Sequence, residues 1–238
     1  MATFVCVHGA FQGGWVWKNT AQALSALGHQ IFTPTLSGCG HHRQTMSRDL
    51  GLQTYCGNLA AFLQLEDLTD VILVGHSYSG IVCVEAMADI RSRLAGLVFV
   101  DAIIPVPGRS FADLGGEPFA AMLESRLVDG WLIAPWPAAM FGVEGAPDEE
   151  WFMSRVAPFP KAAFTDKTTP GEMLLPLKRH HIRCLQNPNP MLAAMAKRAE
   201  DLGFSMHAIA SNHCPQITAP VELARMLATI AESVVAPA

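Results

Sequence analysis

Short apolar runs alternate with amphipathic stretches along most of this chain. Residues 4–7, 71–74 and 97–100 form runs without polar side chains, which predicts strands buried on both faces of a parallel sheet. Between them, residues 15–27 and 52–65 carry apolar side chains at helical spacing. Strands and helices in this rhythm predict an α/β fold, with a mostly parallel central sheet covered by helices on both faces.

The rhythm breaks after residue 104, where prolines, glycines and large aromatic residues gather without strand alternation. We expect residues 105–176 to form a helical cap, or lid, inserted in the core. The alternation then resumes, with strands expected at 181–185 and 205–210 and helices at 191–202 and 221–234. The predicted division is therefore a core of residues 1–104 and 177–238 with a cap of residues 105–176.

Composition narrows the class of protein. The chain has 238 residues, of which half are hydrophobic and 16% charged, so one domain can bury about 70–75% of its unfolded surface. A net charge of −5 without clustered Lys or Arg gives no reason to expect nucleic acid as a partner. No run of 18 apolar residues predicts a membrane span, and no signal peptide is visible. The six scattered cysteines indicate reduced thiols in a cytoplasmic protein.

The most informative stretch is residues 69–80, TDVILVGHSYSG. A buried strand stops at Gly75, and helical spacing begins at Ile81, so the chain turns sharply around Ser77. This is the layout of a nucleophile elbow, which holds a serine hydroxyl at the end of a sheet. The usual pattern is G-x-S-x-G, but Ser79 takes the last position and glycine follows at Gly80. The alternative is an ordinary strand-to-helix turn with serines as caps.

Two further polar residues follow predicted strands. Asp101 comes after the strand at 97–100, and His213 lies in the loop after the last strand. Ligands bind at the carboxyl ends of strands in open parallel sheets, so Ser77, Asp101 and His213 are candidate catalytic residues. A serine hydroxyl needs an adjacent base at neutral pH, and His213 would take its proton.

The glycine-rich loop after the first strand, residues 8–14, supplies candidate oxyanion donors. A tetrahedral intermediate needs hydrogen-bond donors already in place for its negative oxygen. We expect these to be the backbone N–H groups of Ala10 in this loop and of Tyr78 just after the nucleophile.

Substrate contacts are expected from aromatic side chains. We predict that Phe11, Trp131, Trp136 and Phe141 line the pocket, while most other aromatic residues of the cap join it to the core. The histidine pairs at 41–42 and 180–181 are poor metal ligands, because neighbours in an extended chain point to opposite sides. We therefore expect no metal and no cofactor.

Five motifs carry a resemblance to a known family. HGAFQGGWVW, TPTLSGCG, GHSYSG, VFVDAIIP and SNHCPQITAPVELARML occur in this order. Together they resemble the α/β-hydrolase branch that includes plant methyl-ester esterases, hydroxynitrile lyases and bacterial pyrethroid-hydrolase-like esterases. The resemblance covers residues 3–104 and 178–235. It implies Ser77 as nucleophile, His213 as general base, and Ala10 and Tyr78 as oxyanion donors.

Two departures from that branch bear on mechanism. Its plant members carry the triad acid in the loop that reads QNPNP here, at residues 186–190, where no carboxylate is present. We assign the acid to Asp101, with a structural aspartate that caps a turn as the alternative. The lyases place a lysine after the catalytic histidine and a threonine in the oxyanion loop, and this chain has Cys214 and Gly9 there. A cyanohydrin lyase activity would therefore lack the lysine cation that it uses.

The sequence therefore predicts a cofactor-free, carboxylesterase-like serine hydrolase (EC 3.1.1-type). Its substrate would be a small, largely apolar ester, with an amide or a carbamate as variants, cleaved through an acyl-enzyme on Ser77. A lyase or C–C bond-cleaving enzyme of the same fold and a non-catalytic ligand receptor are the alternatives. We expect a small-molecule substrate as partner, with neither nucleic acid nor membrane. A homodimer is one open option for the oligomeric state.

Overall fold

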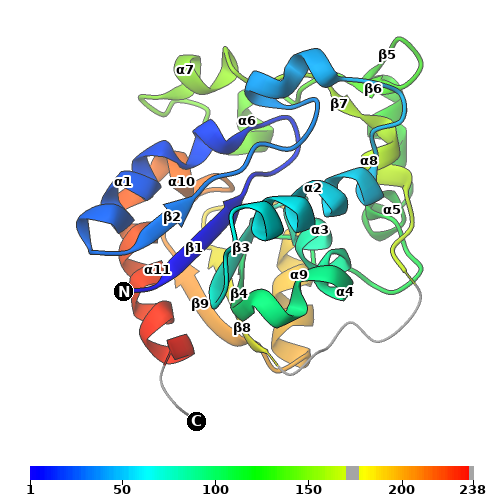
Figure 1. The fold of residues 1–238 in the computed structure, drawn as a ribbon. Coiled ribbons are helices and arrows are strands. Elements are labelled where there is room, and N and C mark those ends of the chain that lie inside the picture. The colour runs from blue at the N-terminus through cyan, green and yellow to red at the C-terminus, as the bar shows by residue number, and fades with distance from the viewer. Residues whose placement is uncertain (170–176, 236–238) are drawn as a thin grey trace.

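A computed structural model describes residues 1–169 and 177–235 and contains one central parallel sheet (Figure 1). Every neighbouring pair of its strands runs parallel. In spatial order the strands are β2 (Gln30–Phe32), β1 (Thr3–Val7), β3 (Val71–His76), β4 (Leu94–Val100), β8 (Lys178–Cys184) and β9 (Ser205–Ile209). The expected α/β fold with its parallel sheet is confirmed, and β3 at its centre is buried along its whole length.

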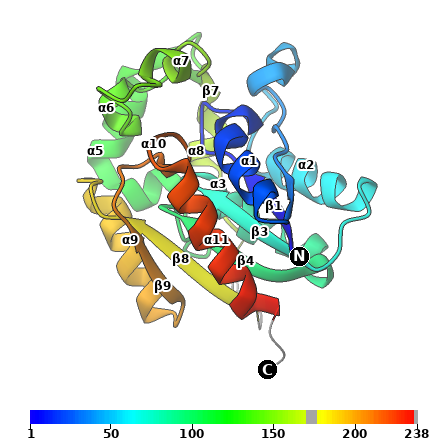
Figure 2. The ribbon, with the colours of Figure 1, turned by 90° about the vertical axis from the view of Figure 1, so that its left-hand side faces the viewer.

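Helices cover both faces of this sheet (Figures 1 and 2). One face carries α1 (Lys18–Ala26) and α11 (Pro220–Val235), with the short α10 (Pro215–Thr218) before the latter. The other face carries α2 (Leu52–Leu65), α3 (Ser79–Glu85), α4 (Met87–Ile90) and α9 (Pro190–Asp201). Short 3₁₀ turns, η1 (Gly14–Trp17), η2 (Gly40–Thr45) and η3 (Arg91–Arg93), join these elements.

The first helix begins differently from the expectation. Residues 14–17 form the 3₁₀ turn η1, and the α-helix starts only at Lys18. Gly14, the first residue of this turn, lies at a close contact, because a Cβ there would lie 2.0 Å from the carbonyl oxygen of Thr33. The backbone of η1 is thus pressed against the chain that leaves β2, and only glycine fits at this contact.

The segment expected to be a helical cap lies across the carboxyl ends of the strands (Figure 1). Its helices are α5 (Phe111–Ser125), α6 (Ala138–Phe141), α7 (Glu149–Met153) and α8 (Lys161–Thr165). It also contains a three-stranded antiparallel sheet of β5 (Leu127–Val128), β6 (Leu132–Ile133) and β7 (Phe159–Pro160). The expected helices are thus accompanied by short strands, which the sequence did not indicate because strands of two residues cannot show alternation. The expected end of the cap, at residue 176, lies outside the described residues.

All six cysteines are buried free thiols. Burial raises the pKa of Cys39 to about 12 and that of Cys56 to about 12, because the charged thiolate loses its hydration. Among the described helices, none has the length and apolar character needed to cross a membrane.

Candidate active site

Ser77 stands at the tight turn between β3 and α3. Its backbone φ of 54° is in the left-handed region, which few non-glycine residues adopt. The turn is held by its own backbone, since the N–H of Ser77 donates to Val100 (3.2 Å) and its carbonyl accepts from Ile103 (3.0 Å) and Gly80 (3.2 Å). These bonds hold the nucleophile candidate to the segment that follows β4.

The two residues that depart from the usual elbow pattern each have a structural reason. A Cβ at Gly80 would lie 2.2 Å from the carbonyl oxygen of Ile103, so glycine is required here. Ser79 is fully buried, and its hydroxyl donates a hydrogen bond to the carbonyl of His8 instead of capping α3. The serine thus joins the elbow to the glycine-rich loop after β1.

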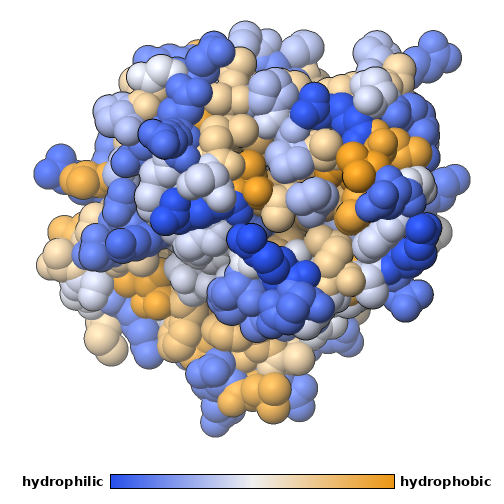
Figure 3. All heavy atoms as spheres, turned by 90° about the horizontal axis from the view of Figure 1, so that it is seen from above, coloured by the Kyte–Doolittle hydropathy of each residue, from blue (hydrophilic) through white to orange (hydrophobic). Residues whose placement is uncertain are grey.

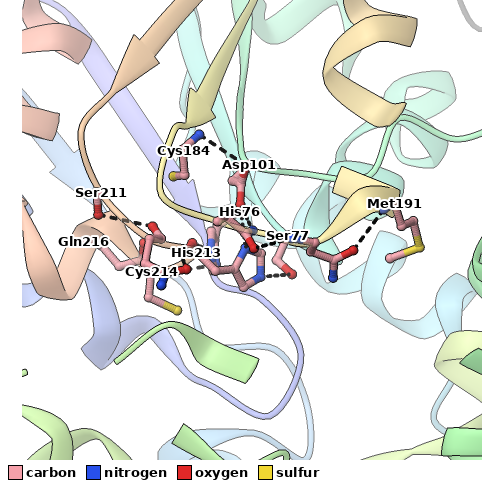
Figure 4. Close-up of polar contacts among 12 residues, drawn as sticks. His76, Ser77, Asp101, Cys184, Met191, Ser211, His213, Cys214 and Gln216 are labelled. Carbon is pink, nitrogen blue, oxygen red and sulfur yellow. Dashed lines mark hydrogen bonds and ion pairs between the residues drawn. The ribbon is translucent and has the colours of Figure 1, made fainter. Parts of the chain in front are cut away.

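The structure brings Ser77, His213 and Asp101 together in that order (Figure 4). Nε2 of His213 lies 3.0 Å from Oγ of Ser77. Nδ1 of the same ring lies 2.8 Å from Oδ2 of Asp101. Asp101 follows β4 and is 2% exposed, and His213 follows β9 and is 9% exposed. A proton can therefore pass from the hydroxyl to a histidine whose other nitrogen faces a buried carboxylate.

Asp101 is kept ionised by its partners. Burial on its own would raise the pKa of this carboxyl, but the hydrogen bond and the charge of His213 lower it, together with the Asn187 side chain and the backbone N–H of Cys184. Nδ2 of Asn187 lies 2.6 Å from Oδ2, and the Cys184 nitrogen lies 3.3 Å from Oδ1. The net effect is a lowered pKa, so the carboxylate is negative at neutral pH.

His76, which precedes Ser77, is a polar residue whose role the sequence did not reveal. Its Nε2 donates to the carbonyl of His213 (2.9 Å), and its Nδ1 accepts from Nε2 of Gln216 (3.2 Å). Burial and then the nearby His213 lower the pKa of His76 to about 3, so the ring stays neutral. The contact lies between segments 137 residues apart, and no local pattern in the sequence could have indicated it.

The loop that carries Ala10 is fixed by buried polar side chains. Nδ1 of His8 donates to the carbonyl of Gly9 (2.8 Å), while its Nε2 accepts from the backbone of Leu36 (3.1 Å). Gln12 accepts from the N–H of Gly9 (3.2 Å) and donates to Sγ of Cys214 (3.6 Å). Gln12 thereby connects the glycine-rich loop to the histidine loop.

The two expected oxyanion donors remain available. Within residues 1–169 and 177–235, neither the backbone N–H of Ala10 nor that of Tyr78 has a protein acceptor. Ala10 borders the cavity beside Ser77. Unpaired N–H groups at this position suit an oxygen that becomes negative during a reaction.

A cavity of about 70 Å³ adjoins Ser77 and His213. Most of its wall is apolar, and among residues 1–169 and 177–235 no Lys, Arg, Asp or Glu lines it. The lining residues are Ala10, Gln12, Ser77, Phe111, Phe119, Trp136, Met140, Phe141, Asn189, Met191, Leu192 and His213. The wall reaches the surface at Met140, which is 45% exposed. On the cap side of the molecule, apolar residues form separate groups between hydrophilic ones (Figure 3).

The expected pocket residues divide into three cases. Trp136 and Phe141 line the cavity. Phe11 does not line it, but lies buried behind it with its ring 4.3 Å from that of Trp136. Trp131 lies elsewhere in the cap, with the Arg48 guanidinium 5.3 Å from its ring centre. Sequence reasoning did not assign Phe111 and Phe119 of α5 to the pocket. Because α5 is interrupted at Gly116 (φ 69°), helical spacing could not indicate that these two rings stack, with their centres 4.8 Å apart.

The two histidine pairs differ in their surroundings, and His41 and His42 lie in the 3₁₀ turn η2, not in extended chain as expected. Nδ1 of His180 lies 3.1 Å from Nε2 of His207, across β8 and β9, and the rings of His41 and His42 lie 4.1 Å apart. In the part of the chain that the structure describes, no group of three or more His, Cys, Asp or Glu side chains could hold a metal ion.

Comparison with known protein families identifies the family of this chain. The model of the alpha/beta hydrolase family matches residues 4–226. The chain belongs to the alpha/beta hydrolase family. The resemblance inferred from the five motifs is thereby confirmed.

Similar proteins narrow the class further. A carbendazim hydrolyzing esterase from Nocardioides sp. (strain SG-4G) is 34% identical over 168 residues, covering 66% of this chain and 69% of that protein. Methylesterase 7 of Arabidopsis thaliana is 32% identical over 148 residues, covering 61% of this chain. The match spans about half of that relative's length, at 54%. Both relatives are esterases, so the expectation of a carboxylesterase-like hydrolase is confirmed.

A solved structure shares the whole fold. It is an extracellular alpha/beta-hydrolase from a Paenibacillus species, said to share structural and functional homology with tobacco salicylic acid binding protein 2. The TM-score is 0.85 at 23% identity, over 96% of this chain and 98% of that one. At this identity the likeness concerns the fold.

Proposed function

We propose that this protein is a serine hydrolase that cleaves a small, largely apolar ester through an acyl-enzyme on Ser77. The observation that carries the proposal is the pair of distances at His213, 3.0 Å from Nε2 to the Ser77 hydroxyl and 2.8 Å from Nδ1 to the Asp101 carboxylate. A base between a hydroxyl and a buried carboxylate is the arrangement that activates serine.

In the first half of the reaction, Oγ of Ser77 bonds to the acyl carbon while its proton moves to Nε2 of His213. The carbonyl oxygen becomes negative and accepts from the N–H groups of Ala10 and Tyr78. Loss of one such donor costs about 3–4 kcal/mol of transition-state stabilisation. When the intermediate collapses, the C–O bond to the alcohol breaks and the alcohol takes the proton from His213.

In the second half, water attacks the acyl carbon and gives a proton to His213. The acyl bond to Ser77 then breaks, the acid leaves, and the proton returns to Oγ. Asp101 keeps its charge throughout and stabilises the imidazolium that forms in each half. Its lowered pKa supports this role, since the carboxylate is already ionised at neutral pH.

The cavity supports an uncharged substrate. Its wall offers aromatic and thioether surface with Gln12 and Asn189 as neutral polar groups. Apart from His213, none of the described residues that line it could compensate a buried charge. One relative is named a carbendazim hydrolyzing esterase, which supports an ester as the candidate substrate. The six free buried thiols support a reducing compartment, as in the cytoplasm.

The alternative reactions have less support. A cyanohydrin lyase of this fold needs a cation after the catalytic histidine, but Cys214 is a thiol whose pKa burial raises, so it stays neutral. A receptor without turnover would not need the hydrogen-bonded chain from Ser77 to Asp101.

The test is intact mass after treatment with a fluorophosphonate probe, which bonds to an activated serine. We expect one adduct on the wild type, none on Ser77→Ala, and much slower labelling of Asp101→Asn. Ser125→Ala removes an exposed cap serine and serves as the matched control, which should label like the wild type. An accessible small ester tested alongside detects turnover if the cap excludes the probe. Ester hydrolysis by Ser77→Ala at the wild-type rate would contradict the proposal.

A further inference from the structure

Asn187 lies at the candidate active site, although the proposed mechanism does not use it. It follows β8, and its Nδ2 is 2.6 Å from Oδ2 of Asp101 and 3.4 Å from Nδ1 of His213. The same carboxylate oxygen accepts from His213. The Asn187 amide therefore contacts both the Asp101 carboxylate and the His213 ring that this carboxylate orients.

The orientation of this amide is fixed by the chain. Oδ1 of Asn187 accepts from the backbone N–H of Asn189 at 3.0 Å, so Nδ2 must face Asp101. The loop itself is anchored, because the N–H of Asn187 donates to Cys184 (3.3 Å) and that of Gln186 donates to Ser211 (3.0 Å). Asn187 thus presents a donor to the carboxylate from a well-defined direction.

We propose that Asn187 is a positioning residue that holds the Asp101 carboxylate against Nδ1 of His213. We further propose that positions 101 and 187 form a matched pair, in which one must be a carboxylate and the other an amide. This inference rests on the proposed function. The physical reason is charge, because two ionised carboxylates at 2.6 Å would repel each other and take up a proton. Two amides would leave the imidazolium without its counter-charge.

The matched pair makes a prediction about relocation. At 3.4 Å from Nδ1 of His213, position 187 is near enough for a carboxylate there to serve the ring after a small rotation. In the Asp101→Asn/Asn187→Asp protein, the amide at position 101 would take the donor role that Asn187 has now. The pair would work with its members exchanged.

The experiment measures kcat and KM of four proteins on one activated ester. We expect Asp101→Asn to lose about 10⁴ in kcat. We expect Asn187→Asp to lose about tenfold to a hundredfold, and the double variant to regain at least about a hundredfold over Asp101→Asn alone. A merely structural amide would not give this rescue, because both single changes would add their losses.

Two controls keep the result interpretable. Asn212→Asp in the Asp101→Asn background places the same charge beside His213, but Oδ1 of Asn212 accepts from the backbone of His213, so no rescue is expected. Asn187→Ala needs no new charge to be accommodated and should lower kcat about tenfold while KM stays within about twofold.

The outcomes separate this inference from the proposed function. A wild type without turnover or labelling would end the proposed function. An active wild type with no rescue in the folded double variant, or with Asn187→Ala at full activity, would overturn the inference alone.

Discussion

Gly80 offers a sharp test of how closely the elbow is packed. A Cβ at this position would lie 2.2 Å from the carbonyl oxygen of Ile103, whereas ordinary contacts begin near 3.4 Å. The Gly80→Ala change therefore needs a shift of about 1.2 Å between α3 and the segment after β4. Both partners of this contact also bind the carbonyl of Ser77, so the shift would displace the nucleophile candidate.

Two magnitudes follow for Gly80→Ala. Overpacking of this kind costs about 1–3 kcal/mol of folding free energy. A domain of this size loses about 2–4 °C in Tm for each kcal/mol. A displacement of about 1 Å at a reacting group can lower kcat about a hundredfold. We therefore expect a folded protein with a lower Tm and a kcat reduced by about two orders of magnitude on an activated ester.

Gly57→Ala is the matched control. Gly57 is exposed within α2, and a Cβ there meets no atom within 4 Å. Alanine in a helix is favoured over glycine by about 0.5–1 kcal/mol, so this variant should gain stability and keep its activity. The assays are thermal unfolding and ester hydrolysis on both variants. Gly80→Ala with wild-type Tm and kcat would refute this account of the elbow.

Three other predictions follow from buried contacts. Ser79→Ala leaves the carbonyl of His8 without its donor and should cost about 1–3 kcal/mol in urea unfolding, while Ser125→Ala at an exposed serine should stay within about 0.5 kcal/mol. Trp136→Ala should raise the ratio of kcat/KM for longer over shorter acyl esters by about tenfold, and Trp131→Ala, away from the cavity, should not. The pKa of His8 is lowered to about 4 and that of His76 to about 3, both chiefly by burial. Between about pH 6.5 and 4 the unfolded chain binds protons that the native protein does not. The free energy of unfolding therefore decreases as the pH is lowered, by up to about 1.4 kcal/mol per pH unit for each of the two histidines. Urea unfolding that is flat over this range would contradict the last prediction.

The sequence predicted the central sheet well, because buried parallel strands leave unbroken apolar runs. The elbow strand and the helix at residues 52–65 were placed closely for this reason. The strands of the cap could not be placed, since two residues carry no periodicity.

In the candidate site, too, some residues could be predicted from the sequence and others could not. Ser77, Asp101 and His213 could be proposed as neighbours because each follows a strand of the same parallel sheet, and such ends meet at one edge. Asn187 and His76 were missed as partners, since their roles depend on which atom faces which neighbour. The aromatic residues of the cap show the same limit. Their identity predicts burial, but only the path of the chain separates Trp136 at the cavity from Trp131 away from it.

The six buried thiols can report how often parts of the folded protein open to solvent. A thiol-specific reagent cannot reach Cys6, Cys83 or Cys214 while the core is closed, and their raised pKa values keep them unreactive. Each labelling event therefore times an opening of the segment that carries the cysteine. Because Cys6 lies in β1, Cys83 in α3 and Cys214 beside His213, modification rates at these three positions would compare how often the sheet, the elbow helix and the histidine loop open.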